Sequence, residues 1–347
     1  PLTLNQRVRI KIDRWAKAAC ANSDRMTSTL PSQNFFLYLN IDVFPAAWAA
    51  YRSTLITPAN YGTPSFRPIS YWPYNLLKTK RTLRLQKEIE LELIRKTFYS
   101  AQVSRLHGIY LWGDEQSAKR GERWRETEGN HFHADYLVEV GFTYNRLTKV
   151  DTNWIDEYLL HDSTPLDRNS LAWMHSYRRG EPWPTAEPLW EYIAEGRGLV
   201  YGTALRKQAY EKVKTLAPDS LGQLELGRIA VEMGSDLYQL SPFIRQLSPT
   251  SFTVDFHLDS HDENDQFMEK AGDHIKRIME KDRTHINHEA LDLLRGDTRR
   301  PDLRSMGVAF DCSEFSIEAK TLIESLVSAH DGSIWSGLTE PPSAKTP

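Results

Sequence analysis

The chain has 347 residues, of which 40% are apolar, and its formal net charge is −3. This length predicts about two globular domains, each held by a hydrophobic core. Only Cys20 and Cys312 are present and no CxxC pattern occurs, which excludes a disulfide framework or a cysteine metal site. No apolar run reaches the ~18 residues of a membrane span and no signal-peptide pattern opens the chain, so we expect a cytoplasmic protein with no membrane partner.

The charge is spread unevenly along the chain. Residues 1–212 hold 29 Lys and Arg against 23 Asp and Glu, whereas residues 213–347 hold 14 against 23. Two interpretations stay open. Either two domains have ordinary surface biases, or the basic half approaches nucleic acid or another polyanion while the acidic half covers it or recruits a partner.

Hydrophobic periodicity predicts alternating helices and strands in the first 203 residues. In chain order we expect a helix (4–26), an aromatic strand (34–40), an irregular Pro-rich and aromatic loop (57–75), a long helix (76–100), a strand (105–112), a helix begun near Asp114, a strand (133–142) ended by the turn TYNRLTKVD, a short helix capped by Asp151, and a Pro/Trp loop. The segment PLWEYIAEGRGLV (188–200) follows, with Glu191 just before a predicted strand.

The remaining residues predict a smaller α/β or α+β module at 204–347. Its expected elements are helices (204–246), a strand (250–260), a long helix (262–282), a strand (307–313) and a final amphipathic helix (316–330). No internal repeat is present.

The common enzyme signatures GxxxxGK[ST], GxGxxG, GxSxG and HExxH do not occur in the sequence. Two groups have metal-ligand spacing: His131 and His133 on a predicted strand, and HLDSHDEND with His257, Asp259, His261 and Asp262. A metal-dependent nuclease on the second group is one alternative. Zinc needs three or four ligands and a second shell. Ordinary strand polarity explains the first group better, and an acidic helix start explains the second. We therefore expect no metal.

Five segments occur in an order that resembles bacterial and phage proteins of the ADP-ribosyltransferase superfamily: SRLHGIYLWGDEQSAKRG, YLVEVGF, VDTNWIDEYL, SYRRGEP and PLWEYIAEGRGLV. The resemblance covers residues 34–203. It implies an α+β fold in which a split β-sheet (31–203) clamps NAD, preceded by an N-terminal helical segment (1–30). The C-terminal module (204–347) has no counterpart in the resemblance.

By this resemblance Glu191 is the catalytic glutamate. A carboxylate suits the chemistry, because cleavage of the nicotinamide glycosidic bond passes through an oxocarbenium-like state that a nearby negative charge stabilises. Glu195, four residues on, is the rival. The match of Trp190 and Glu191 to the W-E pattern of the family favours Glu191.

The resemblance also implies residues that hold NAD. The first strand carries Tyr38 and Asn40 where the family has His or Arg followed by Thr or Ser; Tyr38 would bond the ribose and Asn40 the nicotinamide amide. Arg105 would pair with the pyrophosphate. Tyr71, with its aromatic neighbours Trp72 and Tyr74, would stack on nicotinamide or on the acceptor base, although such clusters also pack on their own scaffold.

Arg178 and Arg179 lie where the family carries its acceptor-recognition loop. The expected function is therefore mono-ADP-ribosyl transfer from NAD to a macromolecule. Nucleic acid (RNA or DNA) is slightly favoured over protein, because the first half is basic and the last segment resembles DNA-modifying toxins. A toxin or antiphage effector restrained by an antitoxin or chaperone fits the family. NAD hydrolysis and a catalytically inactive binding module stay open, because the first strand departs from the family pattern.

Overall fold

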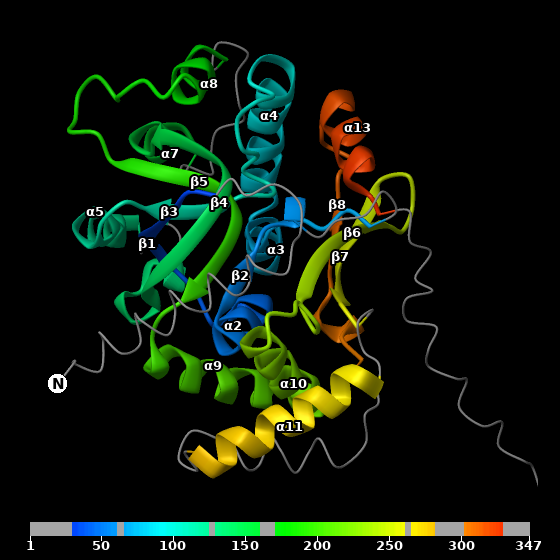
Figure 1. Ribbon diagram of the computed structural model, residues 1–347. Helices are drawn as coiled ribbons and strands as arrows, with labels where there is room; N and C mark the ends of the chain where they lie inside the picture. The colour runs from blue at the N-terminus through cyan, green and yellow to red at the C-terminus, as the bar shows by residue number, and fades with distance from the viewer. Residues whose placement is uncertain are drawn as a thin grey trace, which may run out of the picture.

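The computed structural model describes residues 30–60, 66–124, 129–159, 171–260, 265–281 and 302–328. The chain folds as a mixed α+β protein with antiparallel sheets (Figure 1). The predicted helix at 4–26, most of the segment 1–30, and His261 and Asp262 lie outside the described residues. Within the described ranges, every helix is too short or too polar to cross a lipid bilayer.

The described strands are β1 (Ser32–Tyr38), β2 (Thr54–Ile56), β3 (Ile109–Trp112), β4 (Leu137–Asp151), β5 (Trp190–Val200), β6 (Leu240–Gln246), β7 (Ser251–Leu258) and β8 (Val308–Asp311). The described α-helices are α2 (Phe44–Arg52), α3 (Tyr71–Lys78), α4 (Thr82–Phe98), α5 (Glu115–Arg120), α7 (Asn153–Leu159), α8 (Leu171–Arg178), α9 (Thr203–Leu216), α10 (Leu221–Glu232), α11 (Asp265–Lys281) and α13 (Ile317–Leu326). Short 3₁₀ turns include η2 (Gly121–Trp124), η3 (Gly129–Phe132) and η4 (Ala134–Tyr136).

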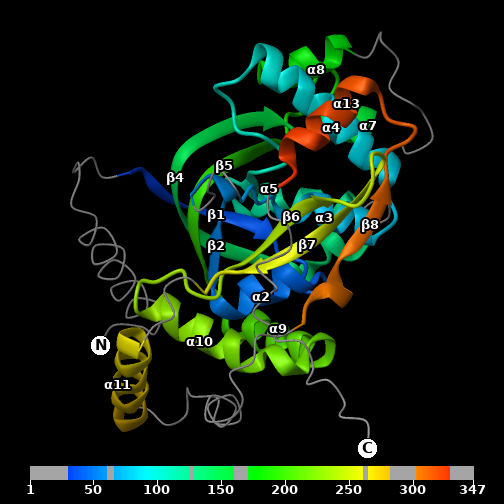
Figure 2. The same ribbon diagram turned by 90° about the vertical axis from the view of Figure 1, so that its right-hand side faces the viewer.

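The first sheet has the strand order β2-β5-β3-β1-β4, and β4 also pairs with β5. All of these pairings are antiparallel. Because β4 bonds to β1 along one edge and to β5 along the other, the sheet closes on itself, and Figure 2 shows the strong curl of β4 and β5. The predicted turn TYNRLTKVD is wrong: these residues continue β4, with a bulge between Tyr144 and Arg146.

Further predictions of local structure differ from the fold. The predicted long helix 76–100 is divided between the end of α3 and α4, because the helix breaks between Lys78 and Thr82. The end of the predicted loop 57–75 forms α3, whose Pro73 occupies the first turn, where a missing N–H costs nothing. The predicted helices at 204–246 end earlier, since residues 240–246 form β6. The strands predicted at 250–260 and 307–313 are confirmed as β7 and β8. Together β6, β7 and β8 form a second antiparallel sheet.

The helix α2 packs between the two sheets (Figures 1 and 2). All nine of its side chains are buried, as expected for a helix that is apolar apart from Arg52 at its end. Phe44 meets Phe256 of β7 with ring centroids 6.1 Å apart, and Trp48 Nε1 donates to the carbonyl of Tyr238 at 2.9 Å. One hydrophobic cluster therefore crosses the predicted boundary at residues 203/204, and the two predicted segments share a core.

Candidate functional site

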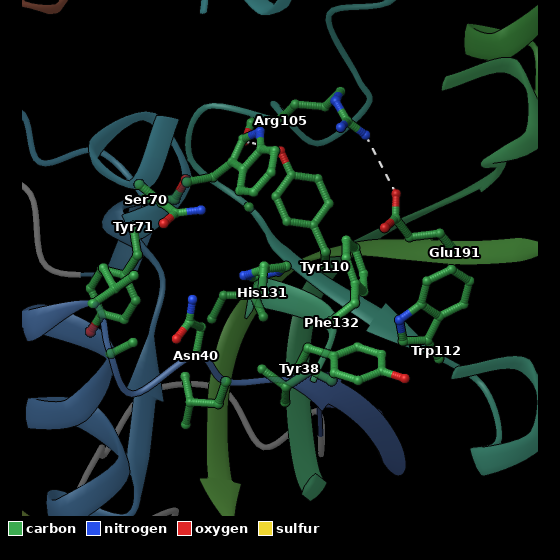
Figure 3. Close-up of a pocket in the computed structure, with 18 of the residues that line it drawn as sticks. Tyr38, Asn40, Ser70, Tyr71, Arg105, Tyr110, Trp112, His131, Phe132 and Glu191 are labelled. Atoms are coloured by element: carbon green, nitrogen blue, oxygen red, sulfur yellow. Dashed lines mark hydrogen bonds and ion pairs between the residues drawn. The ribbon is translucent and has the colours of Figure 1, made fainter. Parts of the chain in front are cut away.

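A cavity that is partly open to solvent lies beside the closed sheet (Figure 3). The wall comes from the end of β1, α2, α3, the segment before β3, β3 itself, η3 and the start of β5. Five residues predicted from the sequence to bind NAD or to act in catalysis line it: Tyr38, Asn40, Tyr71, Arg105 and Glu191.

Glu191 is the second residue of β5, where it pairs with Trp112 of β3 and Val150 of β4. The carboxylate of Asp151 fixes the entry to this strand, since it accepts hydrogen bonds from the backbone N–H groups of Leu189, at 3.0 Å, and Trp183, at 2.8 Å. Side chains alternate along a strand, so Glu191 and Tyr192 lie on opposite faces of β5. Glu191 therefore points away from the hydrophobic core that Tyr192 contacts. The residue is only 8% exposed.

Glu191 belongs to a buried ion network, of which Figure 3 shows the contact with Arg105. Arg105 donates from Nε and Nη2 to the two carboxylate oxygens of Glu88 on α4, at 2.8 and 3.0 Å. Its Nη1 donates to the Tyr177 hydroxyl at 2.6 Å and to Glu191 Oε2 at 3.4 Å. Arg84 adds a second cation to Glu88, at 3.1 Å. The guanidinium of Arg105 is therefore committed mainly to Glu88.

The two buried carboxyl groups of this network have opposite pKa shifts. Burial raises the pKa of Glu191 to about 7; the nearby Arg105 lowers it and the charge of Glu88 raises it further. Burial also disfavours the ionised form of Glu88, but Arg105 and Arg84 outweigh this and hold the pKa of Glu88 at about 2. At neutral pH Glu88 is ionised, whereas Glu191 titrates. A buried carboxyl group that titrates near pH 7 in a cavity is typical of a catalytic acid or base.

Gly108 brings the segment that carries Arg105 against β5. A Cβ atom at this position would lie 2.5 Å from Cγ2 of Ile193, and 2.9 Å from the carbonyl oxygen of Ser104. No side chain fits there without moving the backbone. The approach of Arg105 to Glu191 therefore depends on a glycine at position 108.

The two first-strand residues differ in what they offer to a ligand. The Tyr38 hydroxyl donates to the carbonyl of Ala118 at 3.0 Å. Burial, and then the charge of Glu122, raises the pKa of this hydroxyl. The ring of Tyr38, and not its hydroxyl, therefore forms the wall of the cavity. Asn40 uses Oδ1 to accept from the Asp42 N–H at 3.0 Å. Its amide nitrogen points into the cavity (Figure 3).

Tyr71 reaches the cavity from α3 and not from a loop. Its hydroxyl accepts a hydrogen bond from Gln239 at 3.5 Å. Burial raises its pKa, although Gln239 and Arg52 act in the opposite direction. The contact with Gln239 means that a residue of the C-terminal segment supports one wall of the cavity.

Two polar atoms of the cavity wall are buried without a hydrogen-bond partner in the part of the chain that the structure describes: Ser70 Oγ and His131 Nδ1. Burial, and then Arg81, lowers the pKa of His131 to about 4, so its imidazole is neutral at pH 7. Buried polar atoms are usually paired, and the pairs missing here point to a bound ligand or water. The sequence singled out His131 only as a metal ligand and did not single out Ser70.

The other predicted residues lie elsewhere. The Arg178 side chain is fully buried, with Nη2 3.5 Å from the carbonyl of Leu91, so an acceptor cannot reach it and we withdraw it from the acceptor-binding set. Arg179 is exposed and paired with Glu181 at 2.6 Å, outside the cavity wall. Glu195 lines a different hollow, where Arg146 holds it at 2.5 and 2.6 Å.

The predicted metal groups form no cluster in the described residues. No set of three or more His, Cys, Asp or Glu side chains in these ranges is placed to hold an ion. His131 and His133 do not share a strand, because residues 129–132 and 134–136 form 3₁₀ turns before β4 begins. Half of the second group, His261 and Asp262, lies outside the described residues.

No known protein-family model matches this chain, and no curated protein sequence matches it significantly. Function is therefore inferred from the chemistry of the cavity.

Glu191→Gln is expected to stabilise the protein above pH 7. The folded state holds the Glu191 proton up to about pH 7, whereas the ordinary glutamate pKa is 4.5, so stability falls as pH rises through this window. The full loss of unfolding free energy is about 3 kcal/mol, and a neutral glutamine avoids this loss. Chemical denaturation of both proteins should give a gain in unfolding free energy at pH 8 and almost none at pH 4. An equal gain at both pH values would contradict the buried, titrating carboxyl group.

Proposed function

We propose that this chain is a mono-ADP-ribosyltransferase that moves ADP-ribose from NAD to a macromolecular acceptor. One observation carries the proposal: five residues chosen by a family resemblance, from Tyr38 to Glu191, line one cavity around a buried carboxyl group with a pKa of about 7. An antiparallel sheet that closes on itself supports these residues. The buried, unpaired Ser70 Oγ and His131 Nδ1 add ligand-binding capacity to the same wall.

The proposed chemistry needs one carboxylate. The N-glycosidic bond of NAD breaks with its electron pair going to nicotinamide, which leaves as a neutral molecule, and positive charge develops on the ribose. Ionised Glu191 stabilises this charge by a hydrogen bond from a ribose hydroxyl and by Coulomb attraction in a water-poor cavity. An acceptor nucleophile then bonds to the anomeric carbon and gives up its proton, which the carboxylate or water accepts.

The aromatic wall suits a flat heterocycle. Trp72, Tyr110, Trp112 and Phe132 all contribute to it, and the Trp72 and His131 rings lie 5.4 Å apart. Such walls bind ring systems through stacking and edge contacts. We assign them to the bases of NAD. Nucleic acid is the favoured acceptor class, because residues 1–212 carry an excess of basic side chains that would contact phosphates.

The proposal is tested by incubating the full chain with NAD labelled on the adenine, together with separate pools of protein, DNA and RNA. We expect nicotinamide release and label in a nucleic-acid pool, with uptake that falls as salt rises. Label in the protein pool would correct the acceptor, and release without transfer would make the chain an NAD glycohydrolase. Saturable NAD binding with no release would identify an inactive binding module, and absence of binding would refute the proposal.

A further inference from the structure

The Arg105 guanidinium is shared unequally between two carboxylates. Glu88 receives two hydrogen bonds, at 2.8 and 3.0 Å, whereas Glu191 receives one contact at 3.4 Å. Glu88 is fully buried on α4 and is not part of the cavity wall, while Glu191 is. The two-contact geometry is the stronger one, because a guanidinium fork matches both oxygens of a carboxylate.

We propose that Glu88 is a positioning residue: it holds the Arg105 guanidinium by two contacts and so keeps it from closing on the Glu191 carboxylate. Glu191 is then left with a free oxygen for a ligand in the cavity. The consequence for turnover rests on the proposed function of the chain, whereas the geometry stands without it.

The surroundings fix Arg105 in this arrangement. The Tyr177 hydroxyl accepts from Nη1 at 2.6 Å, and the Tyr110 ring lies 4.7 Å from the guanidinium carbon. The Trp72 indole donates to Glu88 at 3.2 Å, and Arg84 donates to the same oxygen. Each contact either orients Arg105 or keeps Glu88 ionised and in place.

The charged and titratable groups that face Glu191 come from three further elements. Arg105 precedes β3 and Tyr110 lies on it; Glu88 and Arg84 lie on α4; and Tyr177 lies on α8. Both tyrosines have raised pKa values, mainly because of burial, and stay neutral near pH 7. The ionisation of Glu191 is therefore governed by its burial and by the balance of Arg105, Glu88 and Arg84.

Two substitutions should move the Glu191 titration in opposite directions. In Glu88→Gln, a negative charge is lost and Arg105 is released toward Glu191. Both changes favour the ionised form, so the midpoint should fall by about one pH unit or more. At pH 6 the ionised fraction of Glu191 would then rise about fivefold. In Arg105→Gln the neighbouring cation is lost, and the midpoint should rise.

The test uses the full chain labelled with ¹³C at the glutamate carboxyl carbons and titrated by NMR, with the Glu191 signal identified by its loss in Glu191→Gln. The matched control is Glu92→Gln: Glu92 is also buried on α4, but it pairs with Arg95 and not with Arg105. We expect an acid shift in Glu88→Gln and none in Glu92→Gln. An unchanged or alkaline midpoint in Glu88→Gln would overturn the proposal.

Folding and function are tested separately. Thermal unfolding checks that each variant folds. If Glu88→Gln does not fold, Glu88→Asp replaces it, because aspartate keeps the charge but is too short for both contacts. An acid shift of the Glu191 midpoint is expected in Glu88→Asp too, and its absence overturns the proposal.

If NAD is cleaved, the pH midpoint of kcat/KM should follow the NMR midpoint in each variant. NMR shifts as expected without any NAD cleavage would support the positioning role and refute the proposed function.

Discussion

A chain that ends at residue 203 is expected to be unfolded, although it contains the whole candidate site. Residues after 203 supply much of the largest hydrophobic cluster, including Leu224, Leu240, Ile244, Phe252, Val254 and Phe256. Each of these large side chains contributes about 1.5–3 kcal/mol on burial, so their joint loss of about 9–18 kcal/mol is as large as the unfolding free energy of a typical folded protein, about 5–15 kcal/mol. The deletion also leaves Trp48 Nε1 and the Arg52 guanidinium on α2 without their partners.

Circular dichroism and thermal unfolding of the fragment check this expectation. Trp48→Ala in the full chain is the milder version and should cost about 3–5 kcal/mol, while Phe98→Ala, at a side chain that is 61% exposed, should cost very little. A fragment 31–203 that unfolds cooperatively near the melting temperature of the full chain would contradict a shared core and restore the predicted boundary.

Glu191→Gln is expected to lower the rate of nicotinamide release by about 10³-fold. Glutamine keeps the size of the side chain but carries no negative charge when the ribose becomes positive. Below pH 7 the wild-type rate should itself fall, because Glu191 takes up a proton with a pKa of about 7. Initial rates between pH 5.5 and 8.5 measure both effects.

Glu195→Gln is the matched control for this prediction. Glu195 lies on the same strand and is similarly buried, but it pairs closely with Arg146 and does not line the cavity. Its substitution should change the rate by a few-fold at most. A large loss in Glu195→Gln together with an active Glu191→Gln would make Glu195 the catalytic residue, as the sequence alone allows.

Local pattern was enough to place most of the strands that carry the site. The aromatic run around Tyr38 reads as a strand because aromatic residues gather between turn signals. Glu191 is predicted to lie just before a strand, whereas β5 already begins at Trp190. The sequence does not predict the full length of β4, because Asn145 and Arg146 look like turn residues and only pairing with β5 keeps this part of the strand extended. The helix α3 was missed because Pro73 was read as a loop signal.

The environment of the site residues could not be read from the sequence. The resemblance assigns Arg105 to a pyrophosphate, whereas the fold brings Glu88 from α4 to take two of its hydrogen bonds. The burial of Arg178 likewise depends on how α8 packs on α4. The side chains in the sequence define which reactions are possible, whereas tertiary contacts decide which of these side chains remain free to take part in them.

We propose that NAD occupies this cavity with its nicotinamide ribose beside Glu191. A crystal structure of Glu191→Gln with NAD tests this placement, because the variant should bind NAD without cleaving it. The expected result is intact NAD in the cavity, with a ribose hydroxyl within hydrogen-bond distance of the glutamine at position 191 and the aromatic wall against the nicotinamide. An empty cavity at saturating NAD, or NAD bound in the hollow lined by Arg146 and Glu195, would contradict the claim.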